Sequence, residues 1–296
     1  MNFDLNLRPE VVTATLLILL PMLFAALWPE RFAALGRGMP GPVRIALPGL
    51  LGLPYALVAE AFKIFHWGWL AVYALLPVAI AFVLGQARAA DKRLRGNWRD
   101  FAILAVLGVA VDLRWFEPAW PHGLTALGKM LLLDAGIYGF LAVRQLDGVG
   151  FDLRMKARDV WVGVREFLIY AAIAIPLGFW LGFLHVHSGW PDPLRALAAF
   201  VFTFLFIAIP EELFFRGWLQ NLLERRMGRI GSLVVTAVIF GLAHWNKRTT
   251  SFNWRYVVIA AVAGVFYGRA WRADRRVGAS ALTHSTVDTV WSLLLR

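Results

Sequence analysis

The sequence contains no cysteine. Disulfide bonds, thiol catalysis and cysteine-based metal sites are therefore excluded. Charged residues are also scarce, at 17% of the 296 residues, and the 19 Asp and Glu are outnumbered by 30 Lys and Arg. The sequence has no internal repeat and no low-complexity segment.

Apolar residues dominate the composition instead. They make up 59% of the chain, with a mean hydropathy of +0.63, whereas soluble proteins use about 45–50%. The excess must face lipid, and 14 Trp and 22 Phe suit a protein with aromatic side chains at both bilayer interfaces. The N-terminus lacks the basic start and cleavage site of a secretory signal, so Val11–Trp28 is expected to be a retained first span.

The apolar runs predict an all-α, polytopic membrane helical bundle with about eight to ten transmembrane helices, since a bilayer core takes about 20 apolar residues as helix. The candidate spans are Val11–Trp28, Val43–Ala59, Trp67–Ala87, Phe101–Leu113, Leu124–Val143, Phe167–Val186, Leu194–Ile209, Ile230–Trp245, Tyr256–Ala270 and Ala279–Leu295. Phe101–Leu113 is the weakest, because it is short and ends in charged residues.

The distribution of charge predicts two regions. Residues 1–160 form N-terminal spans with few internal charges, and residues 161–296 carry charges inside the spans.

The net charge of +11 comes from basic clusters between apolar runs, which predict cytoplasmic loops and no nucleic-acid partner. Usage rich in Arg, Ala and Trp is typical of a GC-rich bacterium, so we expect a multi-pass protein of the bacterial inner membrane.

The most informative segment follows the apolar run Leu197–Ile209 and reads Pro-Glu-Glu-Leu-Phe-Phe-Arg over residues 210–216. An ionisable group at bilayer depth costs at least about 2.5–3.5 kcal/mol, so three of them require a reason. Glu212 and Arg216 are four residues apart and can pair on a helix, whereas Glu211 points about 100° away. The alternative is that Arg216 marks the cytoplasmic end of a span and both Glu side chains are solvated.

Two histidine motifs follow in later apolar segments. Phe240 and His244 are four residues apart and share a helix face, as do His284 and Asp288. Each motif alone also fits a structural polar residue near a helix end. Ionisable residues inside a membrane prefer the bundle interior and one another, and an acid with two imidazoles suffices to activate water and stabilise an oxyanion.

The three motifs, in this order and in separate spans, resemble those of the CAAX-protease and bacteriocin-processing family (ABI or CPBP) of intramembrane proteases. That family has a Glu-Glu pair followed after three residues by Arg, a Phe followed after three by His, and a His followed after three by Asn or Asp. The matching residues here are Glu211, Glu212 and Arg216, then Phe240 and His244, then His284 and Asp288. The resemblance covers about residues 165–296.

The resemblance implies hydrolysis of peptide bonds in a membrane-associated peptide or protein, with membrane lipid as the surroundings. By this resemblance Glu211 would be the general base on a water that His244 helps to position, and His284 with Asp288 would stabilise the oxyanion. The supporting residues would be Glu212, Arg216 and Phe240.

One departure concerns the last motif, where prenyl-protein processing members carry Asn. An ionised Asp288 cannot donate a hydrogen bond to an oxyanion, so we expect it to orient His284 instead, as carboxylates do for other imidazoles.

The sequence favours a mechanism without a metal or another cofactor, because it has no H-E-x-x-H motif. A Zn²⁺ ion held by Glu211, His244 and His284 is the alternative.

Two other functions stay open at this point: a non-enzymatic membrane scaffold or immunity protein of the same fold, and a proton-coupled transporter with an ion path of charged residues. The absence of an inverted repeat argues against the transporter.

Overall fold

The computed structural model describes residues 8–187, 189, 192–247 and 251–295, and over these residues the chain is helical and contains no strand. Six helical stretches of the described chain are long and apolar enough to cross a membrane: Pro9–Leu27, Gly41–Ala61, Trp67–Ala90, Thr125–Val143, Ala157–Trp180 and Pro193–Leu242. In five of the six, only 22% to 33% of an apolar window of 18 residues is buried, so most side chains of these windows are left to face lipid. The predicted all-α polytopic bundle is confirmed.

The count of spans differs from the predicted eight to ten for a physical reason. Helix α6 (Trp98–Asp112) has only 15 residues, and polar residues dilute the hydropathy of α12 (Trp254–Asp274) and α13 (Val277–Leu294). The predicted span Ile230–Trp245 is the second arm of the long stretch Pro193–Leu242. This stretch bends where the backbone of Gly228 leaves the helical region, with φ of 74° and ψ of −177°.

The chain divides into two compact units, Met1–Asp147 and Gly148–Arg296, whereas the sequence predicted a division after residue 160. The segment that follows Asp147 belongs to the second unit because its backbone bonds to the helices there. The amide of Val277 donates to the carbonyl of Gly150 at 2.9 Å, and Trp271 Nε1 donates to the carbonyl of Val149 at 3.0 Å.

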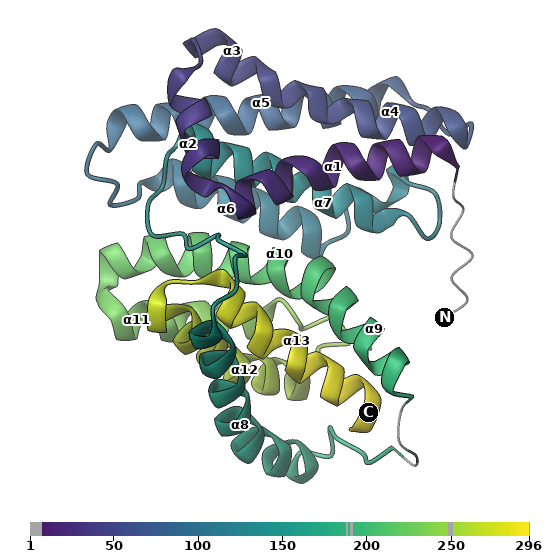
Figure 1. Ribbon diagram of the computed structural model, residues 1–296, viewed down its shortest axis with the longest axis vertical. Helices are drawn as coiled ribbons and strands as arrows, with labels where there is room; N and C mark the ends of the chain where they lie inside the picture. The colour runs from purple at the N-terminus through teal and green to yellow at the C-terminus, as the bar shows by residue number, and fades with distance from the viewer. Residues whose placement is uncertain (1–7, 188, 190–191, 248–250, 296) are drawn as a thin grey trace. The chain divides into compact units, whose positions relative to one another are not determined.

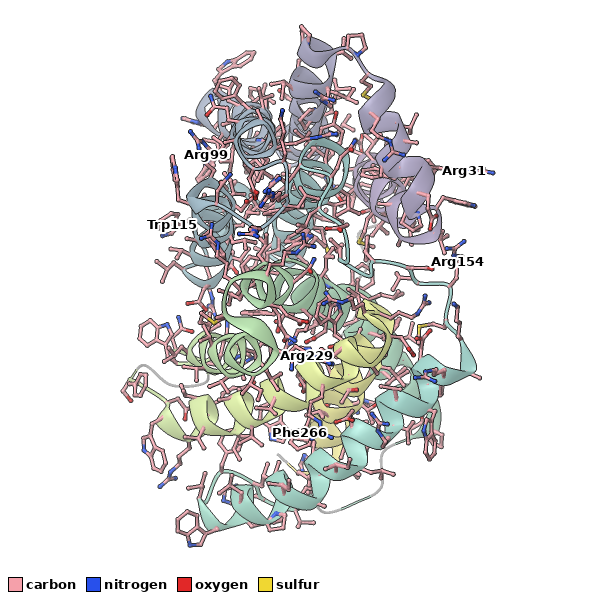
Figure 2. The ribbon with its side chains drawn as sticks, turned by 90° about the vertical axis from the view of Figure 1, so that its left-hand side faces the viewer. Arg31, Arg99, Trp115, Arg154, Arg229 and Phe266 are labelled. Atoms are coloured by element: carbon pink, nitrogen blue, oxygen red, sulfur yellow. The ribbon has the colours of Figure 1, made fainter. Side chains whose placement is uncertain are left out.

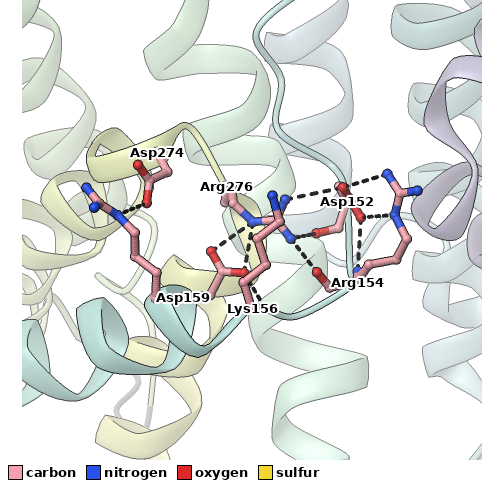
Figure 3. A network of polar contacts seen from close by, with 7 residues as sticks. Asp152, Arg154, Lys156, Asp159, Asp274 and Arg276 are labelled. Atoms are coloured by element: carbon pink, nitrogen blue, oxygen red, sulfur yellow. Dashed lines mark hydrogen bonds and ion pairs between the residues drawn. The ribbon is translucent and has the colours of Figure 1, made fainter.

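Charged side chains fix the same segment to the start of α13 (Figure 3). The guanidinium of Arg276 donates to Asp159 at 2.9 Å and to Asp152 at 3.2 Å. Arg154 donates to both oxygens of Asp152, from Nη2 to Oδ2 at 2.8 Å and from Nε to Oδ1 at 2.9 Å. The hydrogen bonds from Arg154, helped by the charge of Arg276, lower the pKa of Asp152 to about 2. This carboxylate is therefore ionised, and keeps its two arginine partners, throughout the physiological pH range.

The first unit is a helical bundle around α7 (Figure 1). Its helices are α1 (Pro9–Leu27), α2 (Pro29–Gly38), α3 (Gly41–Ala46), η1 (Leu47–Leu51), α4 (Gly52–Ala61), α5 (Trp67–Ala90), α6, η2 (Glu117–Ala119), α7 (Thr125–Ile137) and the π-helical η3 (Tyr138–Val143). Helix α7 contacts α1, α5 and α6, and 78% of Thr125–Val143 is buried. It is the central helix of this unit.

Aromatic side chains gather at the end of this unit where α5 begins. Trp120 Nε1 donates to the hydroxyl of Tyr73 at 2.7 Å, and Tyr55 stacks on Tyr73 with ring centroids 5.2 Å apart. Phe116 lies 5.6 Å from Tyr73. Amphipathic aromatic residues of this kind suit the boundary between hydrocarbon and water.

The opposite end of the unit contains a buried ion pair network. The guanidinium of Arg144 is inaccessible to solvent and lies 2.7 Å from the buried carboxylate of Asp100 and 2.8 Å from Asp91. Asp100 also accepts from the amide of Asn97 and so caps the start of α6. Two carboxylates thus compensate one buried cation and tie the ends of α5, α6 and η3 together.

The second unit contains α8 (Ala157–Trp180), α9 (Pro193–Thr203), the π-helical η4 (Phe204–Ala208), α10 (Ile209–Glu212), the π-helical η5 (Leu213–Gln220), α11 (Asn221–Leu242), α12 and α13. Helix α12 contacts α8, α11 and α13. Phe266 on α12, labelled in Figure 2, packs against Tyr170 of α8 with ring centroids 5.9 Å apart. The motif residues come from α10, η5, α13 and the C-terminal end of α11, so this packing brings them together.

We expect Asp100→Ala to destabilise the protein by about 3–5 kcal/mol, because it leaves the buried Arg144 without its closest counter-ion. Glu117→Ala is the matched control, since Glu117 pairs with Lys129 at the surface, and an exposed pair contributes about 1 kcal/mol or less. Denaturant unfolding of both variants in detergent tests the difference. Equal losses of stability would contradict a structural role for the Arg144 network.

Candidate active site

The two adjacent glutamates lie on α10, a single helical turn between two π-helical segments, η4 and η5. Pro210 has no amide hydrogen to donate to the preceding turn, and the wider π-helical turns lie on either side of it. π-Helical segments are frequent at functional sites, since they redirect side chains within an otherwise continuous helix. Here they flank the single turn that carries both Glu211 and Glu212.

Glu212 is fully buried and accepts hydrogen bonds from three side chains. Arg216 Nη1 lies 2.9 Å from Oε1, His284 Nδ1 lies 2.8 Å from the same oxygen, and the hydroxyl of Ser280 contacts Oε2. The predicted pair between Glu212 and Arg216 is therefore formed, with both side chains inaccessible to solvent. The reading of both glutamates as solvated residues at a span end is wrong for Glu212.

The guanidinium of Arg216 is enclosed by aromatic rings as well as by Glu212. Its Nη2 donates to the carbonyl of Gly264 at 3.1 Å. The guanidinium carbon lies 4.6 Å from the ring centre of Phe240 and 5.2 Å from that of Tyr267. Cation–π contacts and one carboxylate thus compensate a charge that would otherwise be costly to bury.

The contacts of His284 define which of its nitrogens is available for chemistry. A carboxylate only accepts hydrogen bonds, so the contact with Glu212 places a proton on Nδ1. Nε2 then points toward two other carboxylates, Asp288 Oδ2 at 3.5 Å and Glu211 Oε2 at 4.0 Å. Tyr267 stacks on the ring, with centroids 4.6 Å apart and an interplanar angle of 15°.

His284 has a carboxylate on each side of its ring. Glu212 makes the shorter contact, at 2.8 Å from Nδ1, and Asp288 lies 3.5 Å from Nε2 with its side chain 33% exposed. The contact with Asp288 was expected from the spacing of four residues. The contact with Glu212 was not expected, because the sequence paired this glutamate with Arg216 alone.

Glu211 differs from its neighbour in almost every respect. Its side chain is 36% exposed, and its Oε2 is buried without a hydrogen-bond partner. That unpaired oxygen faces His284 Nε2 across 4.0 Å, a gap that a bridging water spans with two ordinary hydrogen bonds. Glu211 thus presents a free carboxylate oxygen to the accessible side of the imidazole.

His244 lies just after the end of α11, and Phe240 lies one turn before it. Nδ1 of His244 is 2.8 Å from the carbonyl of Phe240, so that nitrogen carries a proton and donates. The ring of Phe240 lies 4.9 Å from His244 and 5.7 Å from His284. Both imidazoles therefore flank one buried phenyl ring.

His244, His284 and Asp288 line a common cavity of the second unit. Its other walls are mostly apolar and aromatic side chains of α8, α12 and α13, with Phe183 from the segment after α8. Tyr256 and Trp291 are among them, with ring centroids 5.4 Å apart. The cavity thus joins an apolar interior to a small set of polar atoms, as ligand pockets typically do.

The alternative Zn²⁺ site on Glu211, His244 and His284 does not fit this arrangement. Over the described part of the chain, no group of three or more His, Asp or Glu side chains is arranged to hold a metal ion. The nearest carboxylate to His284 is that of Glu212, which is already engaged by Arg216 and Ser280. No step of the chemistry below therefore involves a metal.

Two residues of the site were missed by the motif search. Ser280 precedes His284 by one helical turn and shares its face of α13, so the spacing of 280, 284 and 288 was a detectable signal. Tyr267 had no such signal, because it lies in an apolar part of α12. It reaches His284 only through the packing of α12 against α13.

Comparison with protein families gives a match over the segment that contains these residues. Residues 193–290 match the family model of the type II CAAX prenyl endopeptidase Rce1-like proteins. All seven motif residues lie within the match, which confirms the resemblance seen in the sequence, although the match begins after α8 and is shorter than expected. Neither the curated proteins nor the solved structures gave a match. The family match supports an intramembrane endopeptidase of the CAAX type.

We expect Glu212→Gln to cost about 3–5 kcal/mol of folding stability, because Arg216 then keeps a buried charge without a counter-ion. The double variant Glu212→Gln with Arg216→Met should recover most of that loss, since it removes the charge and keeps a side chain of similar length. Denaturant unfolding in detergent gives the coupling energy of the cycle. Additive losses in the double variant would show that the two residues do not depend on each other.

Proposed function

We propose that the second unit is an intramembrane endopeptidase of the glutamic type, in which Glu211 activates a water for attack on a peptide bond. The observation that carries this proposal is the unpaired Oε2 of Glu211, which faces His284 Nε2 at 4.0 Å. The family match supports the reaction class. The enclosed cavity beside the site supports a substrate with an apolar segment.

In the proposed reaction Glu211 takes a proton from water, and the resulting hydroxide attacks the carbonyl carbon of the scissile bond. The oxyanion that forms accepts a hydrogen bond from Nε2–H of His284, whose orientation is held by Glu212 and Tyr267. Glu211 then returns the proton to the departing amine. Water is consumed, and one carboxylate and one amine are produced.

His244 and Asp288 have secondary roles in this scheme. Because Nδ1 of His244 donates to the Phe240 carbonyl, its Nε2 is free to accept a hydrogen bond and helps to position the attacking water. Asp288 cannot donate to the oxyanion when ionised. Its place on the Nε2 side of His284 suits an electrostatic partner that keeps this nitrogen protonated.

The proposed substrate is a membrane-associated peptide or protein, and the proposed location is the inner membrane of a bacterium. The surrounding lipid is the medium from which such a substrate enters the apolar cavity. Wild-type protein in proteoliposomes that cleaves no lipidated and no membrane-spanning peptide would favour a scaffold or immunity role instead.

We expect Glu211→Gln to keep the fold and to lower the rate of cleavage by about 10²–10⁴-fold, the usual contribution of a general base. The assay is mass spectrometry of lipidated and membrane-spanning peptides in proteoliposomes, run in H₂¹⁸O so that hydrolysis labels the new carboxyl group. Glu10→Gln, an exposed glutamate of the first unit, is the matched control. Undiminished cleavage by the Glu211 variant would remove Glu211 from the role of base.

We expect activity to survive complete removal of metal ions, because no step of the proposed mechanism involves one. The test compares cleavage rates before and after chelation and dialysis, with metal content measured by elemental analysis. Loss of activity on chelation, with recovery on addition of Zn²⁺ alone, would contradict the glutamic mechanism. Restoration by Mg²⁺ and Ca²⁺ as well would indicate a general effect on the membrane.

A further inference from the structure

Three arginines at the charged end of the first unit lack a carboxylate partner. Arg37 lies in the last turn of α2, Arg44 in α3 and Arg88 in the last turn of α5. Their neighbour Arg144 is neutralised by Asp91 and Asp100. For the three arginines, no ion pair to an acidic residue is found over the described ranges. We call Arg37, Arg44 and Arg88 the arginine site.

Backbone contacts hold two members of the arginine site close together. Arg44 Nη1 donates to the carbonyl of Gly36 at 3.1 Å, and Arg88 Nη1 donates to the carbonyl of Val143 at 3.3 Å. Helix α2 lies directly on η3 at this point, because a Cβ added to Gly36 would come within 2.2 Å of the carbonyl oxygen of Ala142. Because Val143 follows Ala142 in the chain, the two arginines donate to carbonyls that belong to the two sides of this crossing.

The charges of this cluster are not balanced from within the unit. Arg88 is within electrostatic reach of Arg37, Arg44 and Arg144, and only the last of these has acidic partners. Nε of Arg44 is buried and has no hydrogen-bond acceptor. Repulsion between the like charges raises the free energy of the folded protein, and so does the buried donor without an acceptor. A bound anion with several acceptor oxygens would offset the repulsion and accept from the donor.

The side chains of the arginine site and the residues near them indicate which class of anion would fit. Guanidinium groups match the geometry of phosphate oxygens with paired hydrogen bonds. Large apolar side chains near the arginines in sequence are exposed. Leu35, two residues before Arg37, is 51% exposed, and Val43, next to Arg44, is 50% exposed. Phe82, six residues before Arg88 on α5, is 53% exposed. A free phosphate makes no favourable contact with such an apolar surface, whereas the acyl chains of a phospholipid would cover it.

We propose that the arginine site binds the phosphate headgroup of an anionic phospholipid at the basic end of the first unit. Sites of this kind, formed by basic residues between transmembrane helices, hold anionic headgroups in other membrane proteins. The lipid fills the space beside α2, α3 and α5 and completes the charge balance of this end of the bundle.

The test measures lipid binding by native mass spectrometry of the full-length protein in detergent, with phosphatidylglycerol and phosphatidylcholine as probes. The triple variant Arg37→Gln, Arg44→Gln, Arg88→Gln should bind phosphatidylglycerol about a hundredfold more weakly, given the usual contribution of each basic residue. The matched control is Lys92→Gln, Arg93→Gln, Arg95→Gln, which removes the same charge from exposed residues nearby. It should change binding by a much smaller factor.

Equal losses in the two triple variants would overturn the proposal, since they would indicate attraction by net charge alone. Equal binding of the two lipids by the wild-type protein would also overturn it. A separate arm with inorganic phosphate distinguishes the sources of the ligand, because displacement of the lipid by low concentrations of phosphate would assign the site to the free anion.

A conservative variant guards against loss of folding in the triple variant. Arg44→Lys keeps the charge but loses Nε and the planar fork, so it should weaken phosphatidylglycerol binding more than Arg93→Lys does. Thermal unfolding of each purified variant in detergent verifies that it is folded. If both conservative variants bind the lipid as the wild type does, Arg44 makes no specific contact with the headgroup.

Discussion

The carboxylate of Glu212 is the group on which the rest of the site depends. It is fully buried, and it accepts from Arg216, His284 and Ser280, which lie on η5 and α13. A buried charge is tolerated only when partners surround it, and removing any one of them leaves another uncompensated. The pairing of Glu212 therefore fixes how these two helices meet, and by engaging Nδ1 of His284 it leaves Nε2 facing Glu211 and Asp288.

The same constraint explains why two adjacent glutamates serve different purposes. Both oxygens of Glu212 accept structural hydrogen bonds, whereas Glu211 keeps an oxygen without a hydrogen-bond partner on the Nε2 side of His284. Successive residues of a helix point in different directions, so one glutamate enters the core and the other reaches its edge. Glu212 thus holds the surrounding side chains in place, and Glu211 is left as the group available for reaction. Catalytic groups need such a rigid surrounding to keep their geometry.

Buried arginines occur in both units, and each is compensated in its own way. Arg144 in the first unit has two aspartates, and Arg216 in the second has one glutamate, one carbonyl and two aromatic rings. In the arginine site of the first unit, Arg44 and Arg88 each donate to a backbone carbonyl, but no carboxylate among the described residues pairs with them. Arg144 and the arginine site thus lie at the same end of the first unit but differ in their acidic partners. A bound external anion explains this difference better than simple proximity to the membrane surface does.

The sequence by itself determined the helical membrane class, the positions of most of the apolar helices and the pairing of Glu212 with Arg216, because hydropathy and a spacing of four residues act locally along one helix. The family match was also foreseeable, since it rests on three ordered motifs. Only the tertiary structure decided that Glu212 lies closer to His284 than Asp288 does, that Tyr267 stacks on that ring, and that the chain divides after Asp147. Those outcomes depend on contacts between helices distant in sequence, and the burial that selects among competing carboxylates exists only once α10, α12 and α13 have packed.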